Sequence, residues 1–177
     1  ILRAIPEARL LLKDAAFDAP AACREVVTTL ERLGVSAGRI GFLGFSSRER
    51  HLAAFSSVDI VLDSFPQNGG ITTWEALWMG TPVVAMLGNK LASRISAAIL
   101  HALDLGAWVG EGEEAYFAIA TGMAGDLDAL ERFRADIRGR IQASEAGNPE
   151  RYTRAVEAAY RAMWRERLAR QPRTQLP

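Results

Sequence analysis

Apolar and polar residues follow two patterns along this chain, short apolar runs and helical spacing. The first pattern predicts strands and the second predicts helices. Short runs of aliphatic and β-branched residues, typical of buried parallel strands, predict strands over residues 9–13, 39–43, 60–62 and 82–86. Between and after them, apolar residues recur at helical spacing. These segments predict helices over residues 19–33, over a short stretch that opens at Ser46, and over residues 72–79, 91–102, 113–124, 126–143 and 149–168.

The order of these elements predicts the fold class. A helix follows each predicted strand, so the strands should be parallel and joined by right-handed crossovers. We expect a Rossmann-like, doubly wound α/β domain over residues 1–168 and a polar tail over residues 169–177. An apolar stripe on the last predicted helix is expected to be a packing surface rather than a binding site. Its members are Val156, Tyr160, Met163 and Trp164.

The N-terminus predicts that the chain is a piece of a longer protein. It starts at Ile1 without an initiator Met, inside a segment with Leu2 and Ile5 that reads as a helix. We expect further sequence to precede it.

Charge and cysteine content exclude several classes of protein. Lys and Arg number 21 and Asp and Glu number 21, so the net charge is zero and bulk attraction to nucleic acid or to an anionic membrane is not expected. No apolar run approaches the length of a membrane span. The single cysteine, Cys23, excludes an internal disulfide framework and fits the reducing cytoplasm. The basic residues are nearly all Arg, beside abundant Ala, which is typical of a GC-rich bacterial genome.

The loop between the third and fourth predicted strands is where we expect chemistry. After Asp63 the chain turns through the pair Gly69-Gly70 and enters a helix near Thr72. Glycines just before a helix N-terminus let the backbone approach a ligand and leave amide groups for an anion, above all a phosphate or diphosphate. Taken alone, the same pattern is also that of an ordinary strand-to-helix turn in a parallel α/β fold.

Residues 63–84, DSFPQNGGITTWEALWMGTPVV, resemble the sugar-nucleotide loop of the O-linked N-acetylglucosamine transferase family. The resemblance spans nearly the whole chain, because three flanking features agree with it in order. They are Arg39-Ile40 leading to His51, then Leu91-Ala92-Ser93-Arg94, and last Tyr160-Arg161-Ala162-Met163-Trp164. The resemblance implies that the chain is the C-terminal domain of a two-domain GT-B glycosyltransferase. The N-terminal domain of that enzyme, and the first strand of the C-terminal domain, would precede Ile1.

The family resemblance also implies an activity. Such enzymes are inverting and metal-independent, and they move N-acetylglucosamine, or a similar sugar, from a UDP-sugar to Ser or Thr hydroxyls of a protein. The UDP-sugar is a substrate, so no cofactor is implied. The catalytic base, the acceptor groove and a Lys that reaches the diphosphate would lie in the preceding half, and this chain alone should be inactive. Tetratricopeptide repeats further upstream would be the family's usual arrangement.

For the loop, the resemblance implies a UDP-sugar-binding role. Main-chain amides at the helix start, with the Thr72 hydroxyl, would take up the charge of the departing β-phosphate. One turn further in, the Glu75 carboxylate would accept two ribose hydroxyls; alternatively it is a first-turn acid stabilised by the helix dipole. The implied loop residues are Asn68, Gly69, Gly70, Ile71 and Thr72.

His51 is the second implied anchor. It follows the second strand, whose carboxyl end should open onto the same crevice as the loop. The resemblance has it beside the uracil, with backbone atoms near Ser46 reading the base edge, and has Arg48 where the family usually places a Lys. Without the resemblance a lone helical His is an ordinary surface group, and Ser46 with Glu49 shows the spacing of a capping box. We interpret His101, at a helix end, as structural.

Departures from the family pattern keep two alternatives open. The family commonly has a Thr or His where this chain has Gly70 and Ile71, so a hydroxyl near the phosphates is lost at Ile71, and Trp74 is bulky where the family is often small. One alternative is a degenerate UDP-binding or scaffold module without transfer activity. The other is a GT-B transferase that acts on a glycan or a small-molecule acceptor.

Other motifs support no competing chemistry. Asp126-Leu127-Asp128 looks like the metal-binding DxD of the other large glycosyltransferase fold, but it follows Gly125 and opens a helix, so we predict an N-cap at Asp126. Two histidines and one cysteine predict no metal site. Neither a P-loop nor a Gly-x-Ser-x-Gly elbow is present in the sequence.

Overall fold

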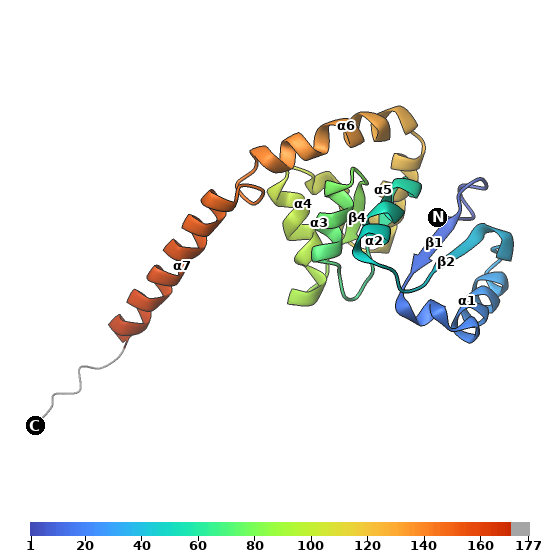
Figure 1. Ribbon diagram of the computed structural model, residues 1–177, viewed down its shortest axis with the longest axis horizontal. Coiled ribbons are helices and arrows are strands. Elements are labelled where there is room, and N and C mark those ends of the chain that lie inside the picture. Colours follow the sequence, from blue (N-terminus) through green and yellow to red (C-terminus); the bar gives the residue numbers. More distant parts are fainter. Residues whose placement is uncertain (171–177) are drawn as a thin grey trace, which may run out of the picture. The chain divides into compact units, whose positions relative to one another are not determined.

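The computed structural model describes residues 1–170 and divides the chain into two compact units, Ile1–Arg138 and Gly139–Pro177. Figure 1 shows the order of the elements. The strands are β1 Leu10–Lys13, β2 Ile40–Leu43, β3 Val61–Leu62, β4 Val83–Met86 and β5 Val109–Gly110. The α-helices are α1 Pro20–Arg32, α2 Arg48–Ala54, α3 Ile71–Trp78, α4 Ile95–Ala102, α5 Glu113–Ala124, α6 Leu127–Ala143 and α7 Pro149–Arg170. Single turns of 3-10 helix are η1 Ala15–Asp18, η2 Ala37–Arg39, η3 Phe55–Ser57, η4 Leu91–Ser93 and η5 Gly106–Trp108.

All strand pairs are parallel, which confirms the predicted α/β class. The strands are hydrogen-bonded in two groups, β1 with β2, and β3 with β4 and β5. In the first group Leu10 pairs with Ile40 and Lys13 with Leu43, so the two strands end in register at the same edge. The residues that follow these two strands are therefore brought side by side.

The core of the first unit is built around β4. Val83, Val84 and Ala85 are fully buried, as expected for a central parallel strand covered on both faces. The inner face of α3 contributes Ala76 and Leu77, which are also fully buried. This burial holds the first turn of α3 in place relative to the sheet.

Helix starts differ from the prediction by one residue at α2. The N-cap is Ser47, whose hydroxyl accepts from the Arg50 amide, and not Ser46. Ser46 is engaged elsewhere, because its Oγ accepts a hydrogen bond from Lys13 Nζ at 2.8 Å. The Asp126 prediction is confirmed: its carboxylate accepts from the Ala129 amide at 2.9 Å and caps α6.

The predicted N-terminal helix is wrong, because residues 2–7 form turns. The Arg39 side chain explains the difference. Its guanidinium donates to the carbonyls of Leu2, Ile5 and Ala8 at 2.6–2.8 Å, and these carbonyls thus have a partner other than the next helical turn. Arg39, part of the family pattern, has a structural role here.

Two other elements depart from the prediction. The helix predicted over residues 91–102 is split into η4 and α4. No strand is predicted near Trp108, where the structure has η5 and the two-residue strand β5, which pairs with β4. β5 consists of Val109 and Gly110 and has no apolar run, whereas the equally short β3 lies in the run at residues 60–62 that predicted it.

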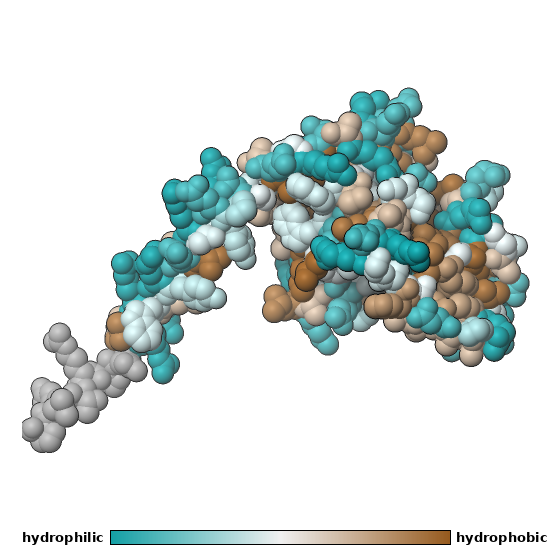
Figure 2. All heavy atoms as spheres, viewed as in Figure 1, coloured by the Kyte–Doolittle hydropathy of each residue, from teal (hydrophilic) through white to brown (hydrophobic). Residues whose placement is uncertain are grey.

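The second unit contains the end of α6 and the long helix α7. Asn148 caps α7, and three ion pairs between residues four apart run along it: Glu150–Arg154, Glu157–Arg161 and Glu166–Arg170. Of the predicted apolar stripe, Tyr160, Met163 and Trp164 are exposed on this helix, and its interpretation as a packing surface stays a prediction. Figure 2 shows hydrophobic and hydrophilic residues side by side on this helix. Helix α7 ends at Arg170, and the rest of the predicted tail lies outside the described residues.

No helix within residues 1–170 is both long and apolar enough to cross a membrane.

Candidate functional site

A hollow of about 460 Å³ opens at the carboxyl ends of β1 and β2. This is the sheet edge where ligands bind in open α/β folds, and the volume is in the range of a small-molecule site. The residues that line it come from the ends of both strands, from α2 and from α3. They are Lys13, Asp14, Ala15, Gly44, Phe45, Ser46, Arg48, His51 and Glu75.

Glu75 is the buried acid of this hollow. It lies in α3, one turn from the helix start, and only 10 % of its side chain is exposed. One carboxylate oxygen is 2.9 Å from the Arg48 guanidinium and the other is 3.1 Å from His51 Nε2. A carboxylate has about four lone-pair sites, so both oxygens can still accept from a ligand. The site therefore presents a fixed double acceptor.

His51 is held on two sides. Its Nε2 meets Glu75, and its ring packs edge-on against Phe55 with centroids 5.4 Å apart. Both contacts orient the imidazole, which is partly exposed where it lines the hollow. The sequence predicted that the carboxyl end of β2 opens onto the same crevice as the loop after β3. The structure places His51 against Glu75 of α3, the helix that follows this loop.

The glycine loop is tied down by an internal network. The Gly69 amide donates to Asp63 Oδ1 at 2.8 Å, and the Gly69 carbonyl accepts from Ser96 Oγ at 3.1 Å. Ser96 also exchanges a hydrogen bond with Thr73 Oγ1 at 2.8 Å. Both backbone groups of Gly69 are therefore engaged, its amide by Asp63 and its carbonyl by Ser96 of α4.

Asn68 is buried and serves the same network. Its amide donates to the Ala92 carbonyl at 2.9 Å, which ties the loop to the Leu91-Ala92-Ser93-Arg94 turn, and its side-chain NH₂ donates to the Ser64 carbonyl at 3.1 Å. Its Oδ1 is buried without a protein partner. The structure gives Asn68 the role of shaping the loop.

Asp63 is a buried carboxyl at the base of this loop. Desolvation by burial raises its pKa above the ordinary 3.8, against the lowering effect of the Gly69 amide, the Ser96 hydroxyl and the Ser64 amide. Its Oδ2 has no protein partner. Tyr116 donates to the Asp63 carbonyl at 3.0 Å, and burial, then the negative charge of Asp63, raise the pKa of the Tyr116 phenol.

Helix α3 begins with open amide groups. Gly70 is its N-cap and makes no side-chain cap hydrogen bond. The amides of Ile71, Thr72 and Thr73 have no carbonyl one turn earlier to bond, as at any helix start. Ile71 and Thr72 are exposed. An anion at this end would meet free donors and the positive end of the helix dipole.

The structure thus brings together four of the predicted site residues and leaves the others beside them. Ser46, Arg48, His51 and Glu75 line the hollow, whereas residues 68–72 do not. Sequence reasoning missed Lys13 and Phe45, which line it as well. The available signal was position, because Lys13 ends β1 and Phe45 follows β2, and ligands of open α/β folds bind at the carboxyl ends of the strands.

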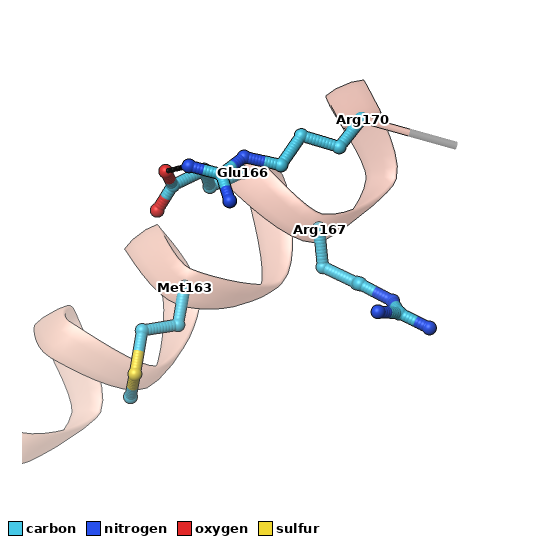
Figure 3. A pocket seen from close by; sticks show the side chains of 4 residues that line it. All are labelled: Met163, Glu166, Arg167 and Arg170. Atoms are coloured by element: carbon cyan, nitrogen blue, oxygen red, sulfur yellow. Dashed lines mark hydrogen bonds and ion pairs between the residues drawn. The ribbon is translucent and has the colours of Figure 1, made fainter. Parts of the chain in front are cut away.

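Two other candidate sites are weak. A smaller hollow of about 200 Å³ on α7 is lined by Met163, Glu166, Arg167 and Arg170, which all project from that one helix in Figure 3, so it has a single wall. Among residues 1–170, no three His, Cys, Asp or Glu side chains gather where they could hold a metal ion.

Comparisons with known proteins identify the family. The glycosyl transferase family 41 model matches residues 1–156. The chain is 36 % identical over 166 residues to a probable UDP-N-acetylglucosamine–peptide N-acetylglucosaminyltransferase SPINDLY of Oryza sativa subsp. japonica, and 30 % identical over 132 residues to a UDP-N-acetylglucosamine–peptide N-acetylglucosaminyltransferase of Caenorhabditis elegans. These alignments cover 93 % and 75 % of the chain but only 18 % and 12 % of the relatives.

A solved structure agrees with the sequence comparison. A mutant of the Thermobaculum terrenum O-GlcNAc transferase superposes with a TM-score of 0.87 at 34 % identity, over 93 % of this chain and 32 % of that chain. This likeness confirms the α/β, GT-B type of fold, and with the match over residues 1–156 it shows that the chain belongs to glycosyl transferase family 41.

Proposed function

We propose that this chain is the nucleotide-sugar-binding part of a glycosyltransferase that moves N-acetylglucosamine, or a similar sugar, from a UDP-sugar to Ser or Thr hydroxyls of a protein. The observation that carries the proposal is the Glu75 carboxylate, which is buried, oriented by His51 and Arg48, and open to the hollow. A paired acceptor at this depth suits the two adjacent hydroxyls of a ribose. Family membership supports the reaction class.

In the proposed binding mode, each part of the UDP-sugar lies beside the donors or acceptors that suit it. The ribose hydroxyls donate to Glu75, the uracil lies beside His51, and backbone groups near Ser46 meet the base edge. The diphosphate lies at the start of α3, where the open amides from Gly70 to Thr72 and the Thr72 hydroxyl donate to it. Arg48, with 73 % of its side chain exposed, can leave Glu75 for a phosphate oxygen at little cost.

The proposed reaction is a single displacement with inversion. The acceptor hydroxyl oxygen bonds to the anomeric carbon of the sugar, the bond from that carbon to the β-phosphate oxygen breaks, UDP leaves, and the hydroxyl proton passes to a base. Charge grows on the β-phosphate as the bond breaks. Fixed amides and cations that face this oxygen stabilise the transition state more than the ground state, and we propose that they do so without a metal ion.

The acceptor and the base are proposed to belong to other parts of the whole protein. The chain spans less than a fifth of the curated relatives it matches, and those relatives are named as peptide transferases. By itself the chain should bind the UDP-sugar without transferring the sugar. We also propose that the protein works in the cytoplasm, in keeping with its single cysteine.

The proposal is tested by titrating the chain with UDP, ADP and inorganic phosphate in a calorimeter. UDP should bind more tightly than the other two, and both Glu75→Ala and His51→Ala should lose at least about tenfold in affinity, equal to 1.4 kcal/mol. The second histidine provides a matched control: His101 is exposed and does not line the hollow, so His101→Ala should bind UDP like the parent chain. A folded chain that binds no UDP contradicts the proposal.

One observation favours the scaffold alternative. Ile71, at the first position of α3, is 74 % exposed and places an apolar side chain where the family commonly offers a polar one. If the protein is a scaffold, UDP binding can persist while transfer does not. Transfer of a labelled sugar from UDP-N-acetylglucosamine by the whole protein, absent in Glu75→Ala, distinguishes the two.

A further inference from the structure

The loop that follows β2, residues 44–46, is hydrogen-bonded by two charged side chains, Lys13 and Asp18. On one side Lys13 Nζ donates to the Gly44 carbonyl at 3.0 Å and to Ser46 Oγ at 2.8 Å. On the other, the Phe45 amide donates to both carboxylate oxygens of Asp18 at 3.2 Å. Three successive residues are thereby bound through their polar atoms by two charged side chains.

The glycine at position 44 leaves the space that the Asp18 carboxylate needs to accept from the Phe45 amide. A Cβ added there would lie 1.8 Å from Asp18 Oδ1, so any other residue would push the carboxylate away from the Phe45 amide. Hydrogen bonds from Lys13 and to Asp18 therefore fix the conformation of this loop, rather than burial of its own apolar side chains.

The phenyl ring of Phe45 takes no part in these hydrogen bonds. The residue is 80 % exposed and lines the hollow that also contains His51 and Glu75. Exposing a phenyl ring to water gives up the free energy that its burial would contribute. A loop held this firmly, with its aromatic side chain open to a hollow, is arranged for a ligand with a flat apolar face.

We propose that Phe45 is a base-contact residue, whose ring stacks on the nucleobase of the nucleotide that the hollow binds. The inference rests on the proposed function, because it assigns the base of the proposed nucleotide to the part of the hollow that Phe45 lines, and residues 68–72 do not line this hollow. Every nucleobase has a π-face, so stacking adds affinity without choosing a base. Choice of the base then depends on polar groups at its edge, near Ser46.

Calorimetric titration of the full chain with UDP tests the proposal. Loss of a stacked base typically weakens binding by roughly tenfold to a hundredfold, which is the effect expected for Phe45→Ala. Phe45→Tyr keeps the ring and should bind within about threefold of the parent. Leu33→Ala, which removes another exposed apolar side chain that does not line the hollow, is the matched control and should not change the affinity.

A fluorescent variant gives a second readout. In Phe45→Trp, stacking of uracil should quench the emission of the new indole in proportion to the bound fraction of UDP, measured as the difference from the parent, which has four Trp of its own. Unchanged emission at saturating UDP contradicts the proposal. So does a Phe45→Ala variant that melts like the parent and binds UDP within twofold of it.

The two proposals fail in different ways. If the parent binds UDP but Phe45 has no effect, only the stacking inference falls. If the parent binds no UDP, both fall, and the thermal unfolding of the variants shows that the proteins were intact.

Discussion

The side chains of His51 and Glu75 meet with Nε2 3.1 Å from Oε2, although they come from different helices, α2 and α3. Each helix follows a different strand, α2 after β2 and α3 after β3, and these strands belong to two separately hydrogen-bonded groups. Glu75 is nearly buried and keeps its charge satisfied through His51 and Arg48. The His51–Glu75 contact should therefore contribute to the stability of the fold, and both residues also line the hollow.

A double-mutant cycle should measure this link. Each of His51→Ala and Glu75→Ala removes the contact, so the double variant should be more stable than the sum of the two losses predicts, by about 1 kcal/mol. Urea unfolding of the four proteins gives the coupling. Arg48→Ala is the contrast: its side chain is largely exposed, so we expect a loss below about 0.5 kcal/mol. A coupling near zero would mean that the His51–Glu75 contact is not formed in solution.

The glycine pair should show two different requirements. A Cβ on Gly69 would lie 2.6 Å from Thr72 Oγ1 and 2.8 Å from Thr73 Oγ1, closer than atoms can approach. A Cβ on Gly70 would meet only Ile95 Cγ2, at 3.5 Å, an ordinary contact. We expect Gly69→Ala to destabilise the chain by about 1–3 kcal/mol through forced displacement of the loop.

Gly70→Ala is the matched control for Gly69→Ala and should cost less than about 1 kcal/mol, mainly as a poorer N-cap. Thermal unfolding and UDP titration measure both effects. Equal losses in the two variants would contradict the packing described for the loop.

Asp63 should make stability depend on pH. Its pKa is raised by burial, so between the ordinary value near 3.8 and the raised value the folded chain binds more protons than the unfolded one. The contribution of this group to stability is therefore complete below pH 3.8 and is lost as the pH rises through the raised pKa. In Asp63→Asn the amide oxygen can still accept from the Gly69 amide, and no charge is buried.

The stability of Asp63→Asn relative to the parent should consequently increase from pH 3.5 to pH 7. Asp63→Ala should instead lose about 1–3 kcal/mol at low pH, because the Gly69 amide is left without its partner, and this loss should become smaller as the pH rises through the raised pKa of Asp63. Melting temperatures across this pH range measure both. A constant difference between Asp63→Asn and the parent would show that Asp63 does not titrate in this range.

The sequence predicted most of the fold because strong local signals agree with the packing. Both ends of α5 are as predicted, and the acidic first turn and the Gly125 stop are local features. At the N-terminus the local pattern failed, since Arg39 binds the carbonyls of Leu2, Ile5 and Ala8 across the fold. A contact between residues more than thirty positions apart has no local signature.

The same distinction applies to the site. Glu75 and His51 could be found because they belong to a recognisable pattern at strand ends, and the structure brings them into contact. The roles of Lys13, Asp18 and Phe45 could not, because a lysine at a strand end or an aromatic residue in a loop has many uses. Only their spatial arrangement distinguishes them.

Ile71 offers a direct test of whether the proposed diphosphate lies at the start of α3. Its side chain is exposed at the first turn of α3, beside amides that have no intrahelical partner. Replacing Ile71 with Thr introduces a hydroxyl that can donate to a phosphate oxygen, and a hydrogen bond to a charged group contributes about 1.5–3 kcal/mol. Ile71→Thr should therefore tighten UDP binding by roughly tenfold or more and leave uridine binding unchanged. Ile71→Val, which keeps the branched apolar shape without the hydroxyl, should bind UDP like the parent. If Thr and Val variants bind UDP equally, the diphosphate does not lie at the start of α3.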